Sequence, residues 1–266
     1  MKETISSLLS ATAEELKSNK FRSCFLAFYI VFTVFSAVYF SLLGQIRNAI
    51  LPVAYAALFI VLLFLAEYFM KIHCGNVFLI ILFFVPIGGI LGSCFDFYML
   101  IPSFDTILHT VSGFIFAALG YCLMERMIYS RAGSSRLAKV AFAFAFSLAI
   151  AVLWELFEWL LTAAMNGDMH EDSLTKNIYS YFLAGSHNET VNITDIEKTL
   201  VYYDGGKVYV IDGGYMDLGL FDTLVDMLVC LCGAVVFVII SLIDHFSKKK
   251  ILHLFVPSCV GDCEKG

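Results

Sequence analysis

The feature that most constrains this sequence is a series of continuous apolar segments, each about as long as a membrane is thick. The six segments fall at about 23–44, 51–70, 77–95, 104–124, 140–163 and 219–243. Roughly 20 apolar residues in an α-helix cross the hydrocarbon core of a bilayer. The segments do not alternate in polarity, which argues against a transmembrane β-barrel. The sequence therefore predicts an all-α integral membrane protein with about six transmembrane helices.

Composition agrees with this fold class. Of the 266 residues, 60% are hydrophobic and only 15% are charged, whereas a soluble domain carries roughly a quarter of charged residues. The basic residues are few and scattered, so we expect no nucleic-acid partner, and the lipid bilayer is the expected environment. With four prolines and no Ser/Gly-rich tract, the sequence predicts no linker and no separate soluble domain.

The transmembrane domain is expected to span 23–243, between two cytoplasmic ends. The segment 1–22 has apolar residues near helical spacing, which predicts a short amphipathic helix at the membrane surface. The segment 244–266 is expected to be a cytoplasmic tail. The cysteines within apolar segments, Cys230 among them, are interpreted as small hydrophobic residues.

The distribution of Lys and Arg predicts the orientation. With a cytoplasmic N-terminus, 13 of the 17 basic residues fall in cytoplasmic segments and four fall outside. The positive-inside rule requires such an excess. We therefore expect a multi-pass membrane protein with both termini cytoplasmic.

The only long connection, 164–218, is then an outer loop. It is acidic, with nine Asp and Glu against three Lys. Within it, 199–203 and 207–211 are rich in β-branched and aromatic residues and flank Asp204-Gly205-Gly206. Such turn residues tolerate a positive φ, so the sequence predicts a small β-hairpin at 199–211.

Ionisable residues occur in pairs inside three of the apolar segments. Insertion scales put the cost of one charged residue near the bilayer centre at about 2.5–3.5 kcal/mol. The pairs are Asp105 with His109, Glu155 with Glu158, and Asp222 with Asp226. Because the members of each pair are three or four positions apart, they lie on one face of their helix.

The expected topology places the three pairs at one depth. The fourth and sixth helices run inward from the outer face, and the fifth runs outward. At 1.5 Å per residue, His109, Glu158 and Asp226 each fall roughly 8–10 Å below the outer ends of their helices. We therefore expect all six side chains to converge on one cavity that opens to the outer face.

Five carboxylates and one imidazole at close quarters suit a bound cation, because like charges otherwise raise some of the pKa values. Oxygen ligands with one imidazole favour Mg²⁺, Mn²⁺ or Zn²⁺ over a soft metal. The predicted divalent-metal ligands are Asp105, His109, Glu155, Glu158, Asp222 and Asp226. A bound ion would promote deprotonation of water, with Glu155, Glu158 or His109 as the catalytic general base.

Other polar and aromatic residues near these pairs receive simpler interpretations. His170 and His187 lie in the outer loop without ligand spacing, so they are expected to be surface residues. Trp154 and Trp159 flank the glutamates and are interpreted as residues of the interfacial aromatic belt, with Trp159 also placed to contact a substrate.

The paired residues also resemble those of known families. Asp105-Thr-Ile-Leu-His109, followed by Ser112-Gly113-Phe114, is similar to the opening motif of VanZ-like membrane proteins. With Trp154-Glu155-Leu-Phe-Glu158-Trp159 and Asp222-Thr223-Leu-Val-Asp226-Met227, then Gly233-Ala234, the pattern over about 100–235 resembles the uncharacterised bacterial inner-membrane family that includes YjdF. Phe221 stands where that family usually has Trp, and the preceding loop is longer here. The resemblance implies a protein of the bacterial cytoplasmic (inner) membrane and no particular activity.

Three functions remain open at this point. The leading hypothesis is a metal-assisted activity on an envelope or lipid-linked substrate. A proton- or cation-coupled transporter could use the same cluster, but transport usually needs polar residues or broken helices at mid-depth, and the inner halves of the fourth to sixth segments are apolar. The third is a structural membrane protein in which the pairs cap helix ends or bond between helices.

The orientation can be tested with single cysteines at Thr190 and Ser134, placed in a variant whose native cysteines are replaced. A membrane-impermeant maleimide should label the cysteine at 190 and not the one at 134, since the charge distribution places the loop 164–218 outside and the connection around 134 inside. Labelling confined to 134 would reverse the orientation and the side on which the predicted site opens.

Overall fold

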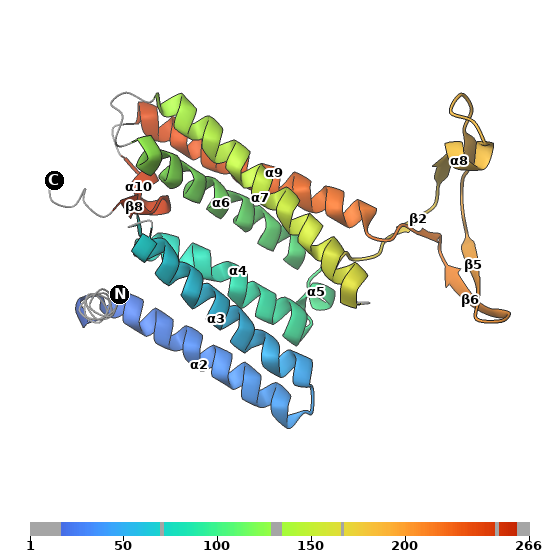
Figure 1. Cartoon of the computed structure of the whole chain (residues 1–266), viewed down its shortest axis with the longest axis horizontal. Helices are drawn as coiled ribbons and strands as arrows, with labels where there is room; N and C mark the ends of the chain where they lie inside the picture. The colour runs from blue at the N-terminus through green and yellow to red at the C-terminus, as the bar shows by residue number, and fades with distance from the viewer. Residues whose placement is uncertain (1–16, 70–71, 129–134, 166–167, 248–249, 260–266) are drawn as a thin grey trace. The chain divides into compact units, whose positions relative to one another are not determined.

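Long apolar helices dominate the computed structural model, which describes residues 17–69, 72–128, 135–165, 168–247 and 250–259 (Figure 1). They are α2 (Lys20–Leu42), α3 (Ile46–Phe69), α4 (Asn76–Phe95), α6 (Phe104–Ile128), α7 (Arg136–Met165) and α9 (Leu220–Phe246). Five are long and apolar enough to cross a membrane, and α3 contributes the shorter apolar stretch Ile46–Val61. The predicted fold class, an all-α membrane protein with about six such helices, is confirmed.

Several helices extend beyond the apolar segments that predicted them. The α6 helix continues to Ile128, and α7 begins at Arg136. Lys139 Nζ donates to Glu125 Oε1 at 2.6 Å between these extensions. Hydropathy marks only the stretch that suits hydrocarbon, whereas the helical hydrogen bonds continue through the polar flanks. The end of α6 and the start of α7 therefore lie outside the predicted boundaries.

The chain forms two compact units, and the first comprises Met1–Ile150 with Val229–Gly266. In this unit α2 packs on α3, α3 on α4, and α4 on α6. Phe83 of α4 lies in its core, with its ring centroid 4.8 Å from that of Tyr29 and 4.7 Å from that of Phe59. Edge-to-face pairs of this kind add to the apolar contacts that hold the helices together.

The α6 helix approaches the middle of α9 closely at two glycines. A side-chain carbon on Gly113 would collide with the backbone of Cys230, and one on Gly233 would collide with the backbone of Thr110. Ser147 Oγ of α7 donates to the Gly113 carbonyl at 2.7 Å. Small residues let membrane helices pack backbone to backbone, where lipid provides no hydrophobic drive for association.

A buried carboxylate holds the end of α9 to neighbouring segments of the first unit. Asp244 Oδ2 accepts from Arg136 Nη2 at 3.0 Å. Its Oδ1 accepts from the backbone N–H groups of Ile251 at 2.6 Å and Leu252 at 2.9 Å. These bonds fix the start of the short helix α10 (Leu252–Phe255), which packs on α4. Strand β1 (Ile72–His73) pairs with β8 (Ser258–Cys259) in the same unit.

The second unit, Ala151–Leu228, contains the last turns of α7, the long connection and the first turns of α9. Strands β5 (Lys198–Tyr203) and β6 (Lys207–Asp212) pair antiparallel, with Leu200 opposite Val210. The turn residues Asp204, Gly205 and Gly206 all have positive φ. This pairing confirms the predicted hairpin. The turn forms here because glycine, and to a lesser degree aspartate, adopts a positive φ at low cost.

The connection holds more structure than was predicted. Strand β2 (Leu174–Thr175) pairs with β7 (Tyr215–Met216), and β3 (Ile178–Ser180) pairs with β4 (Val191–Ile193). A single helical turn, α8 (Tyr181–Ala184), follows β3 and is capped by Ser180 Oγ. Elements of two to four residues carry no periodic signal, so the sequence did not reveal them. The predicted amphipathic helix within 1–22 falls mostly outside the described residues.

The close approach of α6 and α9 predicts the effect of Gly113→Ala. Helix propensity alone would stabilise the protein by up to about 1 kcal/mol. We expect instead a loss of about 1–3 kcal/mol, because the methyl group would collide with Cys230 and force the helices apart.

Thermal unfolding of the purified protein measures the difference. Gly75→Ala serves as the control, since a side-chain carbon there meets nothing within 4 Å. A rise in the thermal midpoint of Gly113→Ala would contradict the close packing.

Candidate functional site

Three ionisable side chains gather in the second unit. Glu155 and Glu158 lie on one face of α7, and His170 lies in the connection that follows this helix. One ligand atom from each residue falls within 4.8 Å of the others. All three are buried, with exposed fractions of 6%, 8% and 8%. Their spacing and burial allow the three to share one cation.

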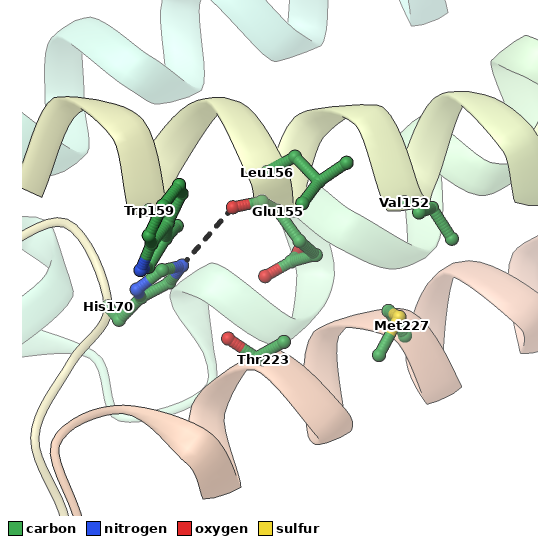
Figure 2. Close-up of a pocket in the computed structure, with 7 residues that line it drawn as sticks. All are labelled: Val152, Glu155, Leu156, Trp159, His170, Thr223 and Met227. Atoms are coloured by element: carbon green, nitrogen blue, oxygen red, sulfur yellow. Dashed lines mark hydrogen bonds between the residues drawn. The ribbon is translucent and has the colours of Figure 1, made fainter.

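Local contacts hold His170 beside α7. The Nε2 atom lies 3.4 Å from the carbonyl oxygen of Glu155, the contact drawn as a dashed line in Figure 2. The preceding residue, Met169, donates its N–H to Thr162 Oγ1 at 3.1 Å. With Nε2–H as the donor, Nδ1 is left to accept a proton or bind a metal. Metal-binding histidines commonly use a backbone carbonyl in this way to fix the ring and its tautomer.

A glycine makes room for this histidine. Gly219 has a φ of +82°, and a side-chain carbon on it would collide with His170 Cβ. Asp217 fixes the backbone there, because its Oδ1 accepts from Gly219 N at 3.0 Å and its Oδ2 accepts from Phe221 N at 2.9 Å. The start of α9 and the position of His170 are thus set by the same short segment.

A pocket of about 460 Å³ adjoins Glu155 and His170 (Figure 2). Three polar residues, Glu155, His170 and Thr223, border it, although the surface that faces the pocket is almost entirely apolar. Its apolar lining consists of Val152, Leu156, Trp159 and Met227. A mostly apolar cavity with a few polar groups at one place is the usual form of a small-molecule site.

Asp222 has a structural contact in the same unit. Its Oδ2 accepts the backbone N–H of Glu171 at 3.0 Å, so the residue after His170 is tied to the first turn of α9. This bond supports the interpretation of Asp222 as a residue that caps a helix end. Glu155 and Glu158, in contrast, belong to the candidate metal site.

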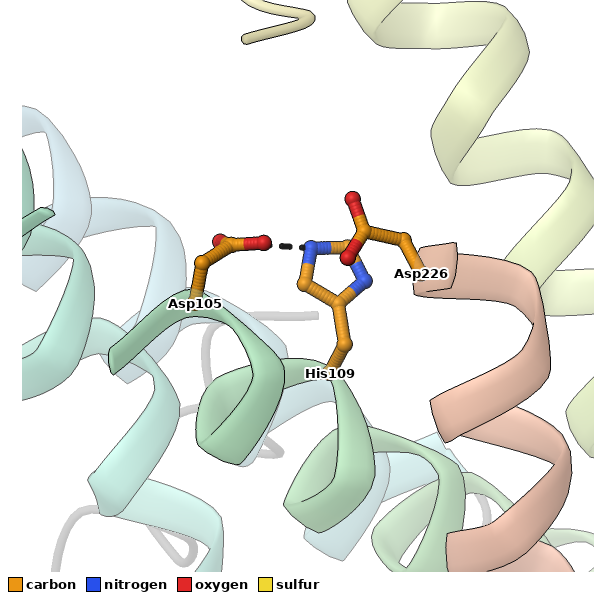
Figure 3. Close-up of side chains that lie close together, drawn as sticks. All are labelled: Asp105, His109 and Asp226. Atoms are coloured by element: carbon orange, nitrogen blue, oxygen red, sulfur yellow. Dashed lines mark ion pairs between the residues drawn. The ribbon is translucent and has the colours of Figure 1, made fainter. Parts of the chain in front are cut away.

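The pair at the start of α6 belongs to the first unit. His109 Nε2 lies 3.6 Å from Asp105 Oδ1 (Figure 3). Cys230 Sγ donates to the His109 carbonyl at 3.2 Å and lies 3.7 Å from His109 Nδ1. The predicted pairing of Asp105 with His109 is confirmed. Cys230 does more than fill space, since its thiol bonds to the helix that carries the pair.

The structure brings only some of the six predicted ligands together within one unit. Glu155 and Glu158 come together as predicted, and Asp226 is buried on α9, with 3% of its surface exposed. The convergence of all six on one cavity stays a prediction. The interpretation of His170 as a surface residue was wrong, because it is buried against Glu155. The one signal in the sequence was its position only 12 residues after Glu158.

The connection beside His170 is rich in acidic residues. Burial raises the pKa of the Asp168 carboxyl, the neighbouring Asp172 carboxylate raises it further, and His170 opposes both effects. Clustered carboxylates of this kind attract cations to a site over distances of several ångströms.

Comparisons with known proteins identify a family. Residues 21–246 match the family described as Predicted membrane protein (DUF2238). No curated protein and no solved structure gave a significant match. The family match agrees with the resemblance to an uncharacterised membrane family, while the VanZ-like similarity of the segment from Asp105 to His109 stays an expectation.

Gly219→Ala should release the contacts around His170. Its methyl group would collide with His170 and so weaken the bond from Glu171 N to Asp222. We expect faster hydrogen exchange at the Glu171 amide in this variant.

Gly205→Ala is a matched control, since its φ of +77° imposes similar backbone strain while nothing lies within 4 Å of the added carbon. At either position the strain itself costs about 1–3 kcal/mol. Equal exchange at Glu171 in the two variants would show that Gly219 does not position His170.

Proposed function

The chain belongs to the DUF2238 family of predicted membrane proteins, and we propose that it binds a divalent cation at Glu155, Glu158 and His170. In this proposal the cation supports a metal-assisted reaction on an envelope or lipid-linked substrate. The protein would act in the bacterial cytoplasmic membrane, with the site opening to the outer face.

The observation that carries the proposal is the convergence of three buried donor groups within 4.8 Å. Two carboxylates buried side by side repel each other and lose hydration. A buried charge is tolerated when it is paired or bound to a metal. A shared cation offsets both costs at once, which explains why the side chains gather here.

The donor set fits a hard or borderline cation. Two carboxylates and one imidazole suit Mg²⁺, Mn²⁺ or Zn²⁺. Three protein ligands are typical of catalytic zinc sites, which leave a further position for water or substrate. A divalent ion held there would lower the pKa of a bound water and polarise a phosphoryl or carbonyl oxygen. Because Glu155 and His170 also line the pocket, a substrate there would adjoin the ion.

The orientation of the site rests on charge. A cytoplasmic N-terminus would put 13 of the 17 basic residues in cytoplasmic segments, and under the positive-inside rule this supports an outer position for the end of α7 and the connection. The acidic residues of that connection would then face the envelope and draw cations toward the site.

A proton- or cation-coupled transporter is the second candidate. The observation in its favour is the pair of Asp105 and His109 in α6, in which Asp105 is half-buried and His109 is buried. Intramembrane carboxylates and histidines commonly form proton relays in transporters. The third possibility, a structural role without catalysis, is supported by the bond from Glu171 to Asp222.

Metal binding can be tested by thermal unfolding of the purified protein with Mg²⁺, Mn²⁺ or Zn²⁺ against a chelator. A ligand at a hundredfold excess over its Kd stabilises the folded state by about 2.7 kcal/mol. We expect a gain of this order in the wild type for at least one ion. Glu158→Gln and His170→Ala should abolish the gain, because each removes a donor group.

Two control variants lie in the same connection, where His187 and Glu189 are exposed. His187→Ala and Glu189→Gln should keep the full metal-dependent gain. A midpoint that follows pH and ignores every divalent ion would favour the transporter. Loss of the gain in the controls as well would place the metal elsewhere in the acidic connection.

A further inference from the structure

We propose that Cys230 is a nucleophilic thiol, activated by His109, that small hydroperoxides oxidise to a sulfenic acid. Both residues belong to the first unit, whereas the candidate metal ligands Glu155, Glu158 and His170 belong to the second. Oxidation of the thiol therefore requires neither the proposed metal site nor its cation.

The Cys230 thiol lies beside two acceptors of one residue on the neighbouring helix. Its Sγ donates to the His109 carbonyl oxygen at 3.2 Å and lies 3.7 Å from His109 Nδ1. Rotation about the Cβ–Sγ bond moves the thiol hydrogen from the carbonyl toward the ring nitrogen. The thiol is thus held next to a base that can take its proton, which is the condition for an activated nucleophile.

Asp105 determines which ring nitrogen acts as this base. His109 Nε2 lies 3.6 Å from Asp105 Oδ1, and Figure 3 shows this nitrogen turned toward the carboxylate. A carboxylate there favours the tautomer with hydrogen on Nε2, which leaves the lone pair on Nδ1. The same carboxylate stabilises the imidazolium that forms when Nδ1 takes the proton. Asp105 is therefore a positioning residue for the pair.

Close packing of α6 and α9 holds the sulfur and the ring together. Gly113 lies one turn after His109, and a side-chain carbon on it would collide with the backbone of Cys230. Gly233 approaches the backbone of Thr110, the residue after His109, in the same way. Two such approaches on either side of the contact leave the thiol little room to move away from the imidazole.

Burial restricts the reagent to a small one. Cys230 exposes 4% of its surface and His109 exposes 9%. An acyl ester would have to part the two helices to bring its carbonyl carbon to Sγ. Hydrogen peroxide is neutral and little larger than water, so local opening of the helices is enough to admit it. The geometry therefore favours a small hydroperoxide as the substrate.

The reaction balances between the thiol, the imidazole and the peroxide. Nδ1 of His109 takes the thiol proton, and the sulfur of Cys230 attacks one peroxide oxygen. An S–O bond forms, the O–O bond breaks, and the sulfur loses two electrons to the peroxide. The imidazolium returns the proton to the leaving oxygen. Hydrogen peroxide thus yields water, and the thiol becomes a sulfenic acid.

Oxidation can be followed at each cysteine of the full-length protein in lipid nanodiscs. After timed exposure to hydrogen peroxide, the protein is unfolded in dimedone, which tags sulfenic acids, and mass spectrometry locates the tag. We expect Cys230 to be tagged at least about tenfold faster than Cys94, because a well-placed base typically accelerates proton transfer by more than this. Equal tagging of the two cysteines would overturn the inference.

Cys94 is a matched control for burial and for hydrogen bonding. It exposes 6% of its surface, and its Sγ donates to the Asn48 carbonyl at 3.6 Å. Within the described ranges, no imidazole forms a hydrogen bond with this thiol. The difference in rate between Cys230 and Cys94 therefore measures the effect of His109.

Cys232 separates activation from access. It lies two residues along α9 and is exposed, so access alone predicts that it reacts faster than Cys230. The variants Cys232→Ser and Cys230→Ser report each of the two thiols separately. We expect faster tagging of Cys230, and faster tagging of Cys232 would overturn the inference.

His109→Gln tests the base, since it keeps a polar side chain and removes the imidazole. Tagging of Cys230 should fall by about tenfold or more, while tagging of Cys94 stays the same. Unchanged tagging of Cys230 would overturn the role of His109. Faster tagging of both cysteines would report unfolding of the variant, and the comparison of Cys230 with Cys94 in the wild type then decides.

Two variants test Asp105 as a positioning residue. Asp105→Asn should slow the tagging of Cys230, and Asp105→Glu should restore much of the rate, because the carboxylate and not the shape of the side chain orients the ring. Equal loss in both variants would overturn the role of Asp105.

The last comparisons test the size of the substrate and the independence from the metal site. Cumene hydroperoxide should oxidise Cys230 more slowly than hydrogen peroxide at the same concentration, and the reverse order would overturn the assignment to small hydroperoxides. Glu158→Gln should leave the tagging of Cys230 unchanged, and His109→Gln should keep the metal-dependent thermal gain. Failure of either proposal can therefore be recognised separately from failure of the other.

Discussion

A carboxylate removed from water inside a membrane protein needs a positive charge or a set of hydrogen-bond donors nearby, and this requirement governs where the buried acidic residues of the chain lie. A charged residue near the bilayer centre costs about 2.5–3.5 kcal/mol on insertion scales. Glu155 and Glu158 are buried together with His170 instead of facing lipid. Asp244 meets the same requirement by accepting hydrogen bonds from Arg136 and from two backbone N–H groups. The Asp244 carboxylate is therefore held by hydrogen bonds within the fold, and the pair on α7 lies close enough to His170 for the three side chains to hold a cation.

Close packing brings polar groups of two helices together in the first unit. Gly113 and Gly233 bring α6 and α9 near enough for the Cys230 thiol to reach the His109 carbonyl. Association of membrane helices depends on this kind of fit, because lipid surrounds apolar side chains as well as a neighbouring helix does. The contact between Cys230 and His109 therefore depends on these glycines.

The helices and their paired residues could be predicted because both follow from regular spacing. Continuous apolar segments identified the helices, and separations of three or four placed Glu155 with Glu158 and Asp105 with His109 on shared faces. The hairpin was predictable from Asp204-Gly205-Gly206, which favours one turn geometry. His170 could not be found in this way, because its position depends on the path of an irregular connection. The short strands and α8 escaped prediction for the same reason, being too brief to show a period.

The contact between Gly219 and His170 has a consequence for the history of the family. Only glycine combines a φ of +82° with the missing side chain that His170 Cβ requires. Replacement of Gly219 would displace His170, so selection would no longer retain the histidine. Loss of the histidine would in turn remove the steric restriction on position 219. The two residues should therefore have been retained or lost together during descent. Their joint presence would mark the members that share this form of the site, even where the rest of the connection has diverged in length.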